Sequence, residues 1–466
     1  LPRSPALLLW LTGGLAIGAL RATNTWDWPT YLVIGGLAVV FATWRENGRF
    51  SLATLLQSAA RLALLGGLAT ITFWPFADHY GTAYSSVSLW PGSYTYLGNY
   101  LSIYGLFLLF VVTYLAVELR AWARGLTFHG LRRLEPHGWL LVAAPLAFLG
   151  LLVVALLRGY WIAPVVLTLL TIAGLLGLQP RLPAPRRVAL ILLASALGLT
   201  LAVEIVVLDG DIGRMNTVFK FYLQVWTLLS VVAGAAAVWA WPALQRRGRP
   251  VRRAWQIALG LLLFAALLYP VTATRAKWAI RMDHAAPNTL DGMAFMQTVS
   301  YNDRGQTVAL AYDYDAIQWM YRHIQGSPVI VEANDGTAYR SIGSRVAIYT
   351  GLPSVVGWDW HQRQQRSTVP GWLVSNRAND VNAFYNTTSV PEALAFLARY
   401  DVAYVYAGQL EWLYYSPDGM RKFDDMVQAG YLEEVYRNRG TSIYRVLTTG
   451  DAAQAAAPAP PTARTD

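Results

Sequence analysis

Long apolar runs occupy most of the first 275 residues of the chain, and short polar stretches separate them. Most runs are about 20 residues long, the length at which a helix crosses the hydrocarbon core of a bilayer. The nine runs lie near residues 5–20, 29–44, 52–75, 100–119, 138–157, 160–178, 188–208, 221–241 and 254–274. The pattern predicts a polytopic α-helical membrane domain over residues 1–275, with about nine transmembrane helices.

Arginine is concentrated in alternate loops between these runs. The basic loops contain Arg45 and Arg49, then Arg120, Arg124, Arg132 and Arg133, then Arg181, Arg186 and Arg187, then Arg246, Arg247, Arg249, Arg252 and Arg253. The other loops contain only Arg21, Arg158, Arg214 and Lys220. Because cytoplasmic loops carry the excess of positive charge, we expect a multi-pass protein of the plasma membrane with a cytoplasmic N-terminus. Everything after about residue 275 is then extracytoplasmic.

The pattern changes after residue 275, where short apolar strands alternate with amphipathic helices. The expected helices lie near residues 288–299, 313–325, 390–399 and 417–429, and the expected strands near 306–312, 328–332, 345–349, 402–406, 431–437 and 441–446. This alternation predicts an extracytoplasmic α/β domain over residues 276–450, with a partly parallel sheet. The Ala- and Pro-rich residues 451–466 lack apolar periodicity and are expected to be a disordered tail.

Composition narrows the class of protein. The chain of 466 residues is 55% hydrophobic and 14% charged, with a net charge of +10. Much of the arginine excess flanks apolar runs, where anionic lipid accounts for it, so we expect the lipid bilayer as a partner and no nucleic acid. There is no cysteine, which excludes disulfides and Cys-based metal sites or nucleophiles.

Three polar stretches, residues 21–30, 76–99 and 209–220, are predicted to face the same side as the second domain. Glu204 lies about one helical turn inside the predicted span before the third stretch. An acidic residue within a span is costly and usually faces a cavity or a cation. The sidedness therefore places the candidate chemistry at the extracytoplasmic boundary of the membrane.

The third stretch combines carboxylates with basic side chains. Asp209 and Asp211 could bind a divalent cation such as Mg²⁺ or Mn²⁺ through their oxygens. Arg214 and Lys220 could hold a phosphate, Arg214 by its planar fork and Lys220 as a point charge. Alternatively, the two aspartates form a solvated turn and the two basic side chains reach toward lipid headgroups. The sequence leaves both interpretations open.

Asp27 lies between Trp26 and Trp28 at the end of the first predicted span. A carboxylate walled by indoles could act as a general base. Alternatively, the two Trp are interfacial anchors and Asp27 caps the second helix, with Pro29 in its first turn. Together with Asp209 and Asp211, Asp27 is a candidate catalytic carboxylate.

The second domain has two dense polar stretches. Residues 332–336 directly follow a predicted strand, where an α/β sheet tends to place its ligand residues. Trp358, Asp359, His361 and Arg363 lie close together in the second stretch. An aromatic face combined with planar polar groups suits the binding of a sugar. The alternative is a loop that docks on the membrane, with Trp358 at headgroup depth.

Several short segments carry a resemblance to a known family. They are Thr25-Trp26-Asp27-Trp28-Pro29-Thr30, residues 213–222 with Arg214-Met215-Asn216-Thr217-Val218-Phe219-Lys220, Tyr349-Thr350-Gly351-Leu352-Pro353, Gly357-Trp358 and His361-Gln362. The chain resembles the uncharacterised bacterial and archaeal "YYY" family of polytopic membrane proteins, which is distantly similar to GT-C glycosyltransferases. This resemblance implies a polyprenyl-phosphate-linked sugar as donor and a catalytic Asp in the first external loop. Asp27 matches that position only if the first helix of this chain is the first helix of the family; otherwise it is a residue of a second site.

The leading hypothesis is a GT-C-type glycosyltransferase. Arg214 and Lys220 would hold the donor phosphate, directly or with a cation on Asp209 or Asp211. Asp27 would deprotonate the acceptor, which the second domain would bind. One alternative is a non-catalytic subunit or assembly factor that contacts other membrane subunits. Another is a transporter or lipid flippase with Glu204 as its ion site.

Overall fold

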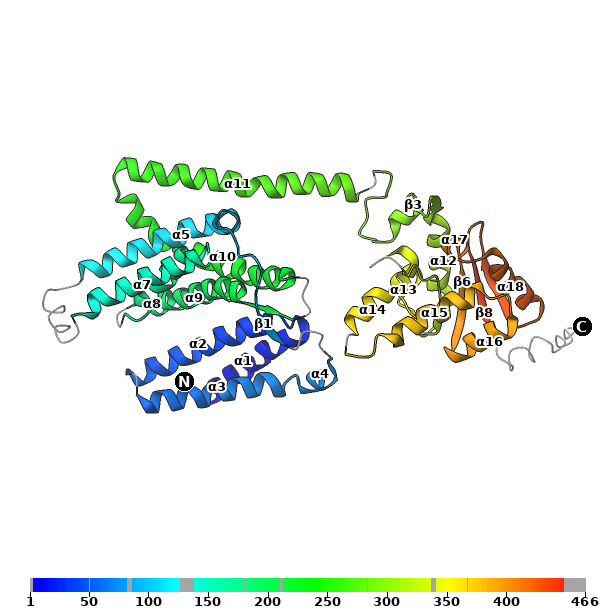
Figure 1. The fold of residues 1–466 in the computed structure, drawn as a ribbon, viewed down its shortest axis with the longest axis horizontal. Coiled ribbons are helices and arrows are strands. Elements are labelled where there is room, and N and C mark those ends of the chain that lie inside the picture. Colours follow the sequence, from blue (N-terminus) through cyan, green and yellow to red (C-terminus); the bar gives the residue numbers. More distant parts are fainter. Residues whose placement is uncertain are drawn as a thin grey trace, which may run out of the picture. The chain divides into compact units, whose positions relative to one another are not determined.

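The computed structural model describes residues 3–49, 51–81, 86–125, 138–179, 182–209, 213–282, 284–336, 341–366 and 368–447. The predicted tail, residues 451–466, lies outside these ranges. The chain divides into two compact units, and the division falls between Val271 and Thr272, inside helix α11 (Arg249–Arg281). Figure 1 shows the helical first unit and the mixed second unit.

Each of the nine predicted apolar runs forms a helix in the first unit. Among the described residues, the helices before α11 are α1 (Arg3–Thr23), α2 (Asp27–Asn47), α3 (Leu52–Ile71), α4 (Trp74–His79), α5 (Leu97–Arg124), α7 (Leu140–Leu157), α8 (Ala163–Gly177), α9 (Ala184–Ile205) and α10 (Met215–Gln245). Within the described ranges, six helices, namely α1, α3, α5, α9, α10 and α11, are long and apolar enough to cross a membrane. The protein is therefore a multi-pass membrane protein, and nine spans remain a prediction.

Helices α5, α8, α9 and α10 enclose the core of the first unit. Tyr104, Leu193, Val225 and Leu229 are fully buried there. Helix α1 packs separately against α3. Gly18 allows this approach, because a Cβ at that position would collide with the carbonyl oxygen of Ala69. Small residues serve the same purpose in membrane helix pairs generally.

Two short strands join polar stretches that lie far apart in the sequence. Strand β1 (Val87–Leu89) precedes α5, and strand β2 (Val206–Leu208) follows α9. They pair antiparallel, with Val87 opposite Leu208 and Leu89 opposite Val206. The pairing fixes the second polar stretch of the sequence beside the start of the third.

The second unit is built on a four-stranded sheet with the order β5-β6-β8-β7. Its strands are β5 (Val329–Val331), β6 (Val402–Ala407), β7 (Leu432–Arg437) and β8 (Ser442–Val446). Strand β5 runs parallel to β6, and the other two pairs are antiparallel. Val331, Val405 and Phe423 contribute to the core between the sheet and its helices.

Helices and a hairpin surround this sheet. The helices are α12 (Leu310–His323), α13 (Arg345–Thr350), α14 (Asp359–Gln365), α15 (Trp372–Asn386), α16 (Val390–Arg399), α17 (Gln409–Tyr414) and α18 (Pro417–Gln428). The hairpin joins β3 (Ser300–Asp303) to β4 (Gln306–Ala309). Arg304 and Gly305 both have positive φ, 47° and 78°, which is the backbone of a two-residue turn that matches the strand twist.

The structure confirms several predicted elements and corrects others. Helix α16 and strands β6 and β8 lie where the pattern placed them. The strand expected at 345–349 is wrong, because these residues form α13, whose first amide groups bind the Glu332 carboxylate. The helix expected at 288–299 is reduced to one short 3₁₀ turn, η2 (Ala294–Gln297). The strand expected at 306–312 ends at Ala309, and α12 begins at Leu310.

Candidate functional site at the start of helix α10

Helix α10 contacts the N-terminus of α2, where Asp27 lies. Gln224 of α10 donates a hydrogen bond from Nε2 to Oδ1 of Asp27 at 2.6 Å. Trp26, next to Asp27, packs edge-to-face on Phe221 with ring centroids 6.0 Å apart. Asp27 is the first residue of α2 and is half-buried. The first polar stretch of the sequence therefore contacts α10 just beyond the third stretch, at Phe221 and Gln224.

Glu204 forms a second polar contact at the same end of α10. Its side chain is fully buried, and Oε1 lies 2.9 Å from Nη1 of Arg214. Thr95 donates from its hydroxyl to Oε1 at 2.6 Å and from its backbone amide to Oε2 at 2.8 Å. A buried carboxylate is tolerated only when a charge partner and hydrogen bonds compensate its lost hydration, and Glu204 has both.

Arg214 is held on several sides immediately before α10. Besides the pair with Glu204, its Nη1 donates to the carbonyl oxygen of Val203 at 2.8 Å. The guanidinium carbon lies 5.3 Å from the ring centroid of Trp90. About 12% of the Arg214 side chain is exposed. Arg214 is therefore a fixed cation at the membrane unit's polar end, with limited access from outside.

Lys220 lies on the same face of α10 as Gln224, because residues four apart are neighbours on a helix surface. It is half-buried. Six residues separate it from Arg214, which corresponds to about 9 Å along the helix. Arg214 lies at the N-terminus of α10, where backbone N–H groups also point outward, and Lys220 lies in the second turn, so this end of the helix favours an anion.

Asp209 lies beyond β2, apart from the Glu204 pair. The Ser86 hydroxyl donates to Oδ2 of Asp209 at 2.6 Å. The hydrogen bonds from Ser86 and then Ser88 hold the pKa of Asp209 below its ordinary value, so the carboxylate is ionised at neutral pH. Asp211 lies outside the described residues. Asp209 can supply one oxygen ligand to Mg²⁺ or Mn²⁺, and a site on both aspartates remains a prediction.

The described ranges contain no group of three or more His, Asp or Glu side chains that could hold a metal ion.

The four candidate residues of the second unit gather around the start of α14. Asp359 is buried, and its Oδ2 lies 3.0 Å from Nη2 of Arg363. Trp358 donates from Nε1 to the carbonyl oxygen of Ser341 at 2.6 Å, and its ring meets His361 edge-to-face at 6.0 Å. These contacts orient the group, and they leave His361 and Arg363 partly exposed.

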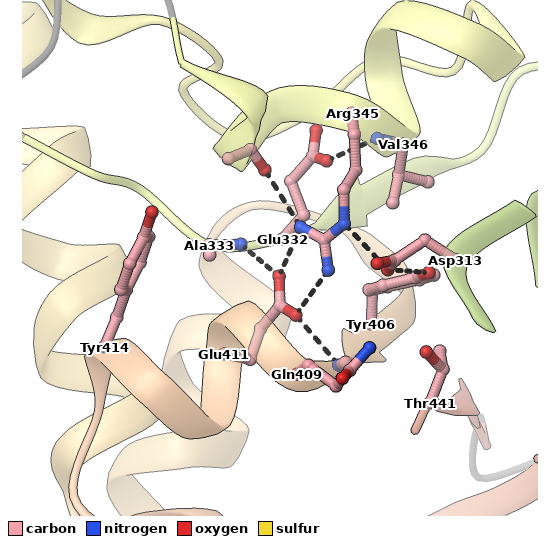
Figure 2. A network of polar contacts seen from close by, with 12 residues as sticks. Asp313, Glu332, Ala333, Arg345, Val346, Tyr406, Gln409, Glu411, Tyr414 and Thr441 are labelled. Carbon is pink, nitrogen blue, oxygen red and sulfur yellow. Dashed lines mark hydrogen bonds and ion pairs between the residues drawn. The ribbon is translucent and has the colours of Figure 1, made fainter. Parts of the chain in front are cut away.

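The second unit also contains a buried ion network (Figure 2). Arg345 is fully buried; its Nε lies 2.7 Å from Oδ1 of Asp313 and its Nη2 lies 2.9 Å from Oε2 of Glu411. The Tyr406 hydroxyl donates to Asp313 at 2.7 Å. Glu332 accepts backbone N–H groups of α13 at 2.8 and 3.1 Å. The network ties α12, α13 and α17 to the ends of β5 and β6.

Burial dominates the proton affinities in this network. It raises the pKa of Glu332 to about 8, although the Arg345 charge and the two backbone hydrogen bonds oppose the shift. It also raises the pKa of Asp313, again against Arg345. Perturbed carboxyls often mark active sites, but they also occur in structural ion networks. Because the network is inaccessible to solvent, we assign it to fold stability.

Sequence reasoning identified Asp27, Glu204 and Arg214 but missed the residues that position them. Gln224 is a polar residue inside the apolar run 221–241, and this break in the run was the one feature of the sequence that could have identified it. Thr95 carries no comparable signal, because its role depends on contacts 109 residues away along the chain. The network around Arg345 was missed except for Glu332, which follows a strand.

A separate apolar cavity of about 460 Å³ lies between α5, α10 and α11. Phe110, Trp241 and Trp255 contribute to its lining, and Trp255 donates to the Thr113 hydroxyl at 2.9 Å. Trp241 is about 25 Å along α10 from Gln224. The cavity is therefore not part of the polar site, and its apolar walls suit a lipid chain.

Residues 2–229 match the model of a family described as "Uncharacterized membrane protein (DUF2298)". The matched segment includes Asp27, Glu204, Arg214, Lys220 and Gln224, so the whole polar site lies within the region similar to this family. No curated protein matches the chain. The comparison supports a membrane protein and assigns no activity to it.

Proposed function

We propose that the protein is an integral membrane glycosyltransferase of GT-C type, which transfers a sugar from a polyprenyl-phosphate donor at the extracytoplasmic face. The observation that carries the proposal is that three functional groups lie on or against α10 between its N-cap, Arg214, and its third turn. Asp27 is bound to Gln224 at 2.6 Å, Arg214 is paired with Glu204 at 2.9 Å, and Lys220 lies on the helix between them. A carboxylate held by α10 and two cations near the start of the same helix suit chemistry on a lipid-linked phosphate.

The phosphate would be held by Lys220 and by the N–H groups of Arg214. A guanidinium has five N–H donors. Nη1 serves Val203 and Glu204, and Nη2 serves the Thr95 hydroxyl at 3.3 Å. The remaining donors would bind the lipid phosphate, and Glu204 and Trp90 would keep the fork in place. Stabilisation of the negative charge on the departing phosphate would be the largest contribution to the rate.

Asp27 would act as the general base. Gln224 fixes Oδ1, and Oδ2 would accept the proton of the acceptor hydroxyl. The acceptor oxygen then bonds to the anomeric carbon of the sugar, while the bond from that carbon to the phosphate oxygen breaks. Polyprenyl phosphate leaves with the bonding electrons. We further propose that Trp358, Asp359, His361 and Arg363 of the second unit bind the acceptor.

The proposal is tested by a transfer assay on the full chain in lipid nanodiscs, with a panel of radiolabelled polyprenyl-phosphate monosaccharides. Asp27→Asn removes the base and should lower kcat by about 10²–10⁴-fold with little change in the KM for donor. Arg214→Ala should raise that KM and lower kcat. Asp78→Asn, an exposed carboxylate in α4, is the matched control and should behave as wild type. Full activity in the double variant of Asp27→Asn and Arg214→Ala would contradict the mechanism.

A second candidate function is that of a non-catalytic subunit of a larger membrane complex. The supporting observation is α11, which has 33 residues and no buried side chain. A partner helix could cover it at the cavity lined by Trp241 and Trp255. This function predicts stable co-purification with other membrane proteins and normal assembly of the Asp27→Asn variant. A transporter has less support, because Glu204 is already engaged by Arg214 and Thr95.

A further inference from the structure

The second unit contains a polar cavity of about 450 Å³ that the α10 chemistry does not use. It lies at the end of the sheet where β6 and β7 end and β8 begins, since Ala407 pairs with Ser442 and Ser442 pairs with Arg437. Helices α17 and α18 and strand β4 complete its walls. The carboxyl end of a strand such as β6 is where α/β proteins commonly place a ligand.

Thr441 gives the cavity an unsatisfied polar group. The residue lines the cavity and is 3% exposed, and among the described residues its buried hydroxyl has no hydrogen-bond partner. The β7–β8 turn does not need this hydroxyl, because Asn438 Oδ1 already accepts the amides of Gly440 and Thr441 at 2.9 and 2.8 Å. A buried hydroxyl without a partner is costly, so a bound ligand would explain its presence.

The wall next to Thr441 is rigid. Gln409 bonds to the backbone of Ala309 through both ends of its amide, donating at 2.9 Å and accepting at 3.3 Å. Figure 2 shows Gln409 and Thr441 on the same side of the buried ion network, which backs this wall. Gln409 is therefore held in place before any ligand arrives, which lowers the entropic cost of binding at this wall.

The mixture of donors and acceptors indicates the class of ligand. Asp424 can only accept hydrogen bonds, Arg437 and Arg439 can only donate, and Thr441 can do both. The negative charge of a phosphate would be repelled by Asp424. Arg437 is already paired with Glu434 at 2.5 Å, and a hydroxyl group, which both donates and accepts, can bond to Asp424, Arg439 or Thr441. Trp412 lines the same cavity with 46% of its surface exposed, which supplies a flat apolar face.

We propose that this cavity binds a saccharide, with one ring lying on Trp412 and one hydroxyl completing the hydrogen bonding of Thr441. The site is separate from α10 and requires no transfer of a sugar. It would give the second unit its own recognition of glycans.

The test is a calorimetric titration of the full chain in nanodiscs. The probes are free oligosaccharides of neutral hexose, of N-acetylhexosamine and of hexuronate, with inorganic phosphate alongside. At least one oligosaccharide should bind the wild type. Trp412→Ala should weaken that binding by about 10-fold or more, and Thr441→Val by about 5- to 10-fold. Trp372→Ala removes an exposed Trp on α15 outside the cavity and should bind as wild type.

Thr441→Val keeps the shape of the side chain and removes only the unsatisfied hydroxyl. Its melting temperature should equal or exceed that of the wild type, so a loss of binding cannot be attributed to misfolding. Asp27→Asn should bind the saccharide normally, which separates this site from the transfer chemistry. Three outcomes would overturn the inference: no saccharide binds, phosphate alone binds, or both cavity variants bind as tightly as wild type.

Discussion

Two buried ionisable side chains of the second unit respond to pH in opposite directions. Lys422 of α18 is 2% exposed, and its Nζ donates to the carbonyl oxygens of Gly419 and Tyr385 at 2.8 and 3.3 Å. Burial lowers the pKa of Lys422 to about 7. Burial raises the pKa of Glu332 to about 8. Each shift makes the stability of the fold depend on pH.

For Lys422, the unfolded chain binds more protons than the folded chain between pH 7 and its ordinary pKa of 10.5. The free energy of unfolding should therefore rise with pH across this window. Lys422→Met should abolish the rise and stabilise the fold at pH 7, by roughly 1–3 kcal/mol, because an apolar side chain has no charge to desolvate. Melting temperatures of the full chain between pH 6.5 and 10 test this. A rise that persists in the variant would rule out Lys422 as its source.

For Glu332, the free energy of unfolding changes with pH in the opposite direction. Between its ordinary pKa of 4.5 and about 8, the folded chain binds more protons than the unfolded chain, so stability should fall as pH increases. The glutamine in Glu332→Gln cannot titrate, so the fall in stability between pH 4.5 and about 8 should be smaller in this variant. The same melting measurements between pH 5 and 8 check the expectation, with the exposed Glu392→Gln as control. An unchanged slope in Glu332→Gln would refute the assignment.

At the scale of elements, the packing of α1 on α3 determines where the α1–α2 turn, and with it Asp27, is held. A Cβ at Gly18 would lie 2.7 Å from Phe73 Cδ2 and 2.9 Å from Thr72 Oγ1, whereas a Cβ at Gly66 of α3 would meet nothing within 4 Å. Gly18 therefore lies on a packed helix surface and Gly66 on an open one, so the same substitution can be compared at the two positions.

Gly18→Ala should destabilise the membrane unit by about 1–3 kcal/mol, because overpacking forces α1 away from α3. Gly66→Ala should be neutral or stabilise it by up to about 1 kcal/mol, because alanine favours the helix. Thermal unfolding in nanodiscs measures both. Equal effects of the two substitutions would show that the contact between α1 and α3 is not tight.

The elements also show how far the sequence could predict this molecule. Apolar runs of bilayer length predicted helices correctly, since only a helix satisfies its backbone within the membrane. The short apolar run at 345–349 misled the prediction, because a run of five residues has no distinguishing period. For the site, side-chain chemistry selected Asp27 and Arg214. The partner of Asp27, Gln224, lies 197 residues away in sequence, so only the tertiary fold could reveal it.

At the scale of the whole molecule, α11 is the element in which the division between the two units falls. Its 33 residues span about 50 Å, which exceeds the roughly 30 Å of the hydrocarbon core. The helix can therefore cross the bilayer and continue beyond it, and Arg275, Lys277 and Arg281 near its end suit an aqueous environment. In the proposed orientation, this end is extracytoplasmic.

The central claim is that the start of α10 binds a lipid-linked phosphate. A structure of the full chain in nanodiscs containing polyprenyl phosphate tests it most directly. We expect the phosphate within hydrogen-bonding distance of Lys220 Nζ and the Arg214 guanidinium, with the Asp27 carboxylate facing it. A phosphate located elsewhere, or an α10 end covered by another subunit, would contradict the claim and favour the non-catalytic role.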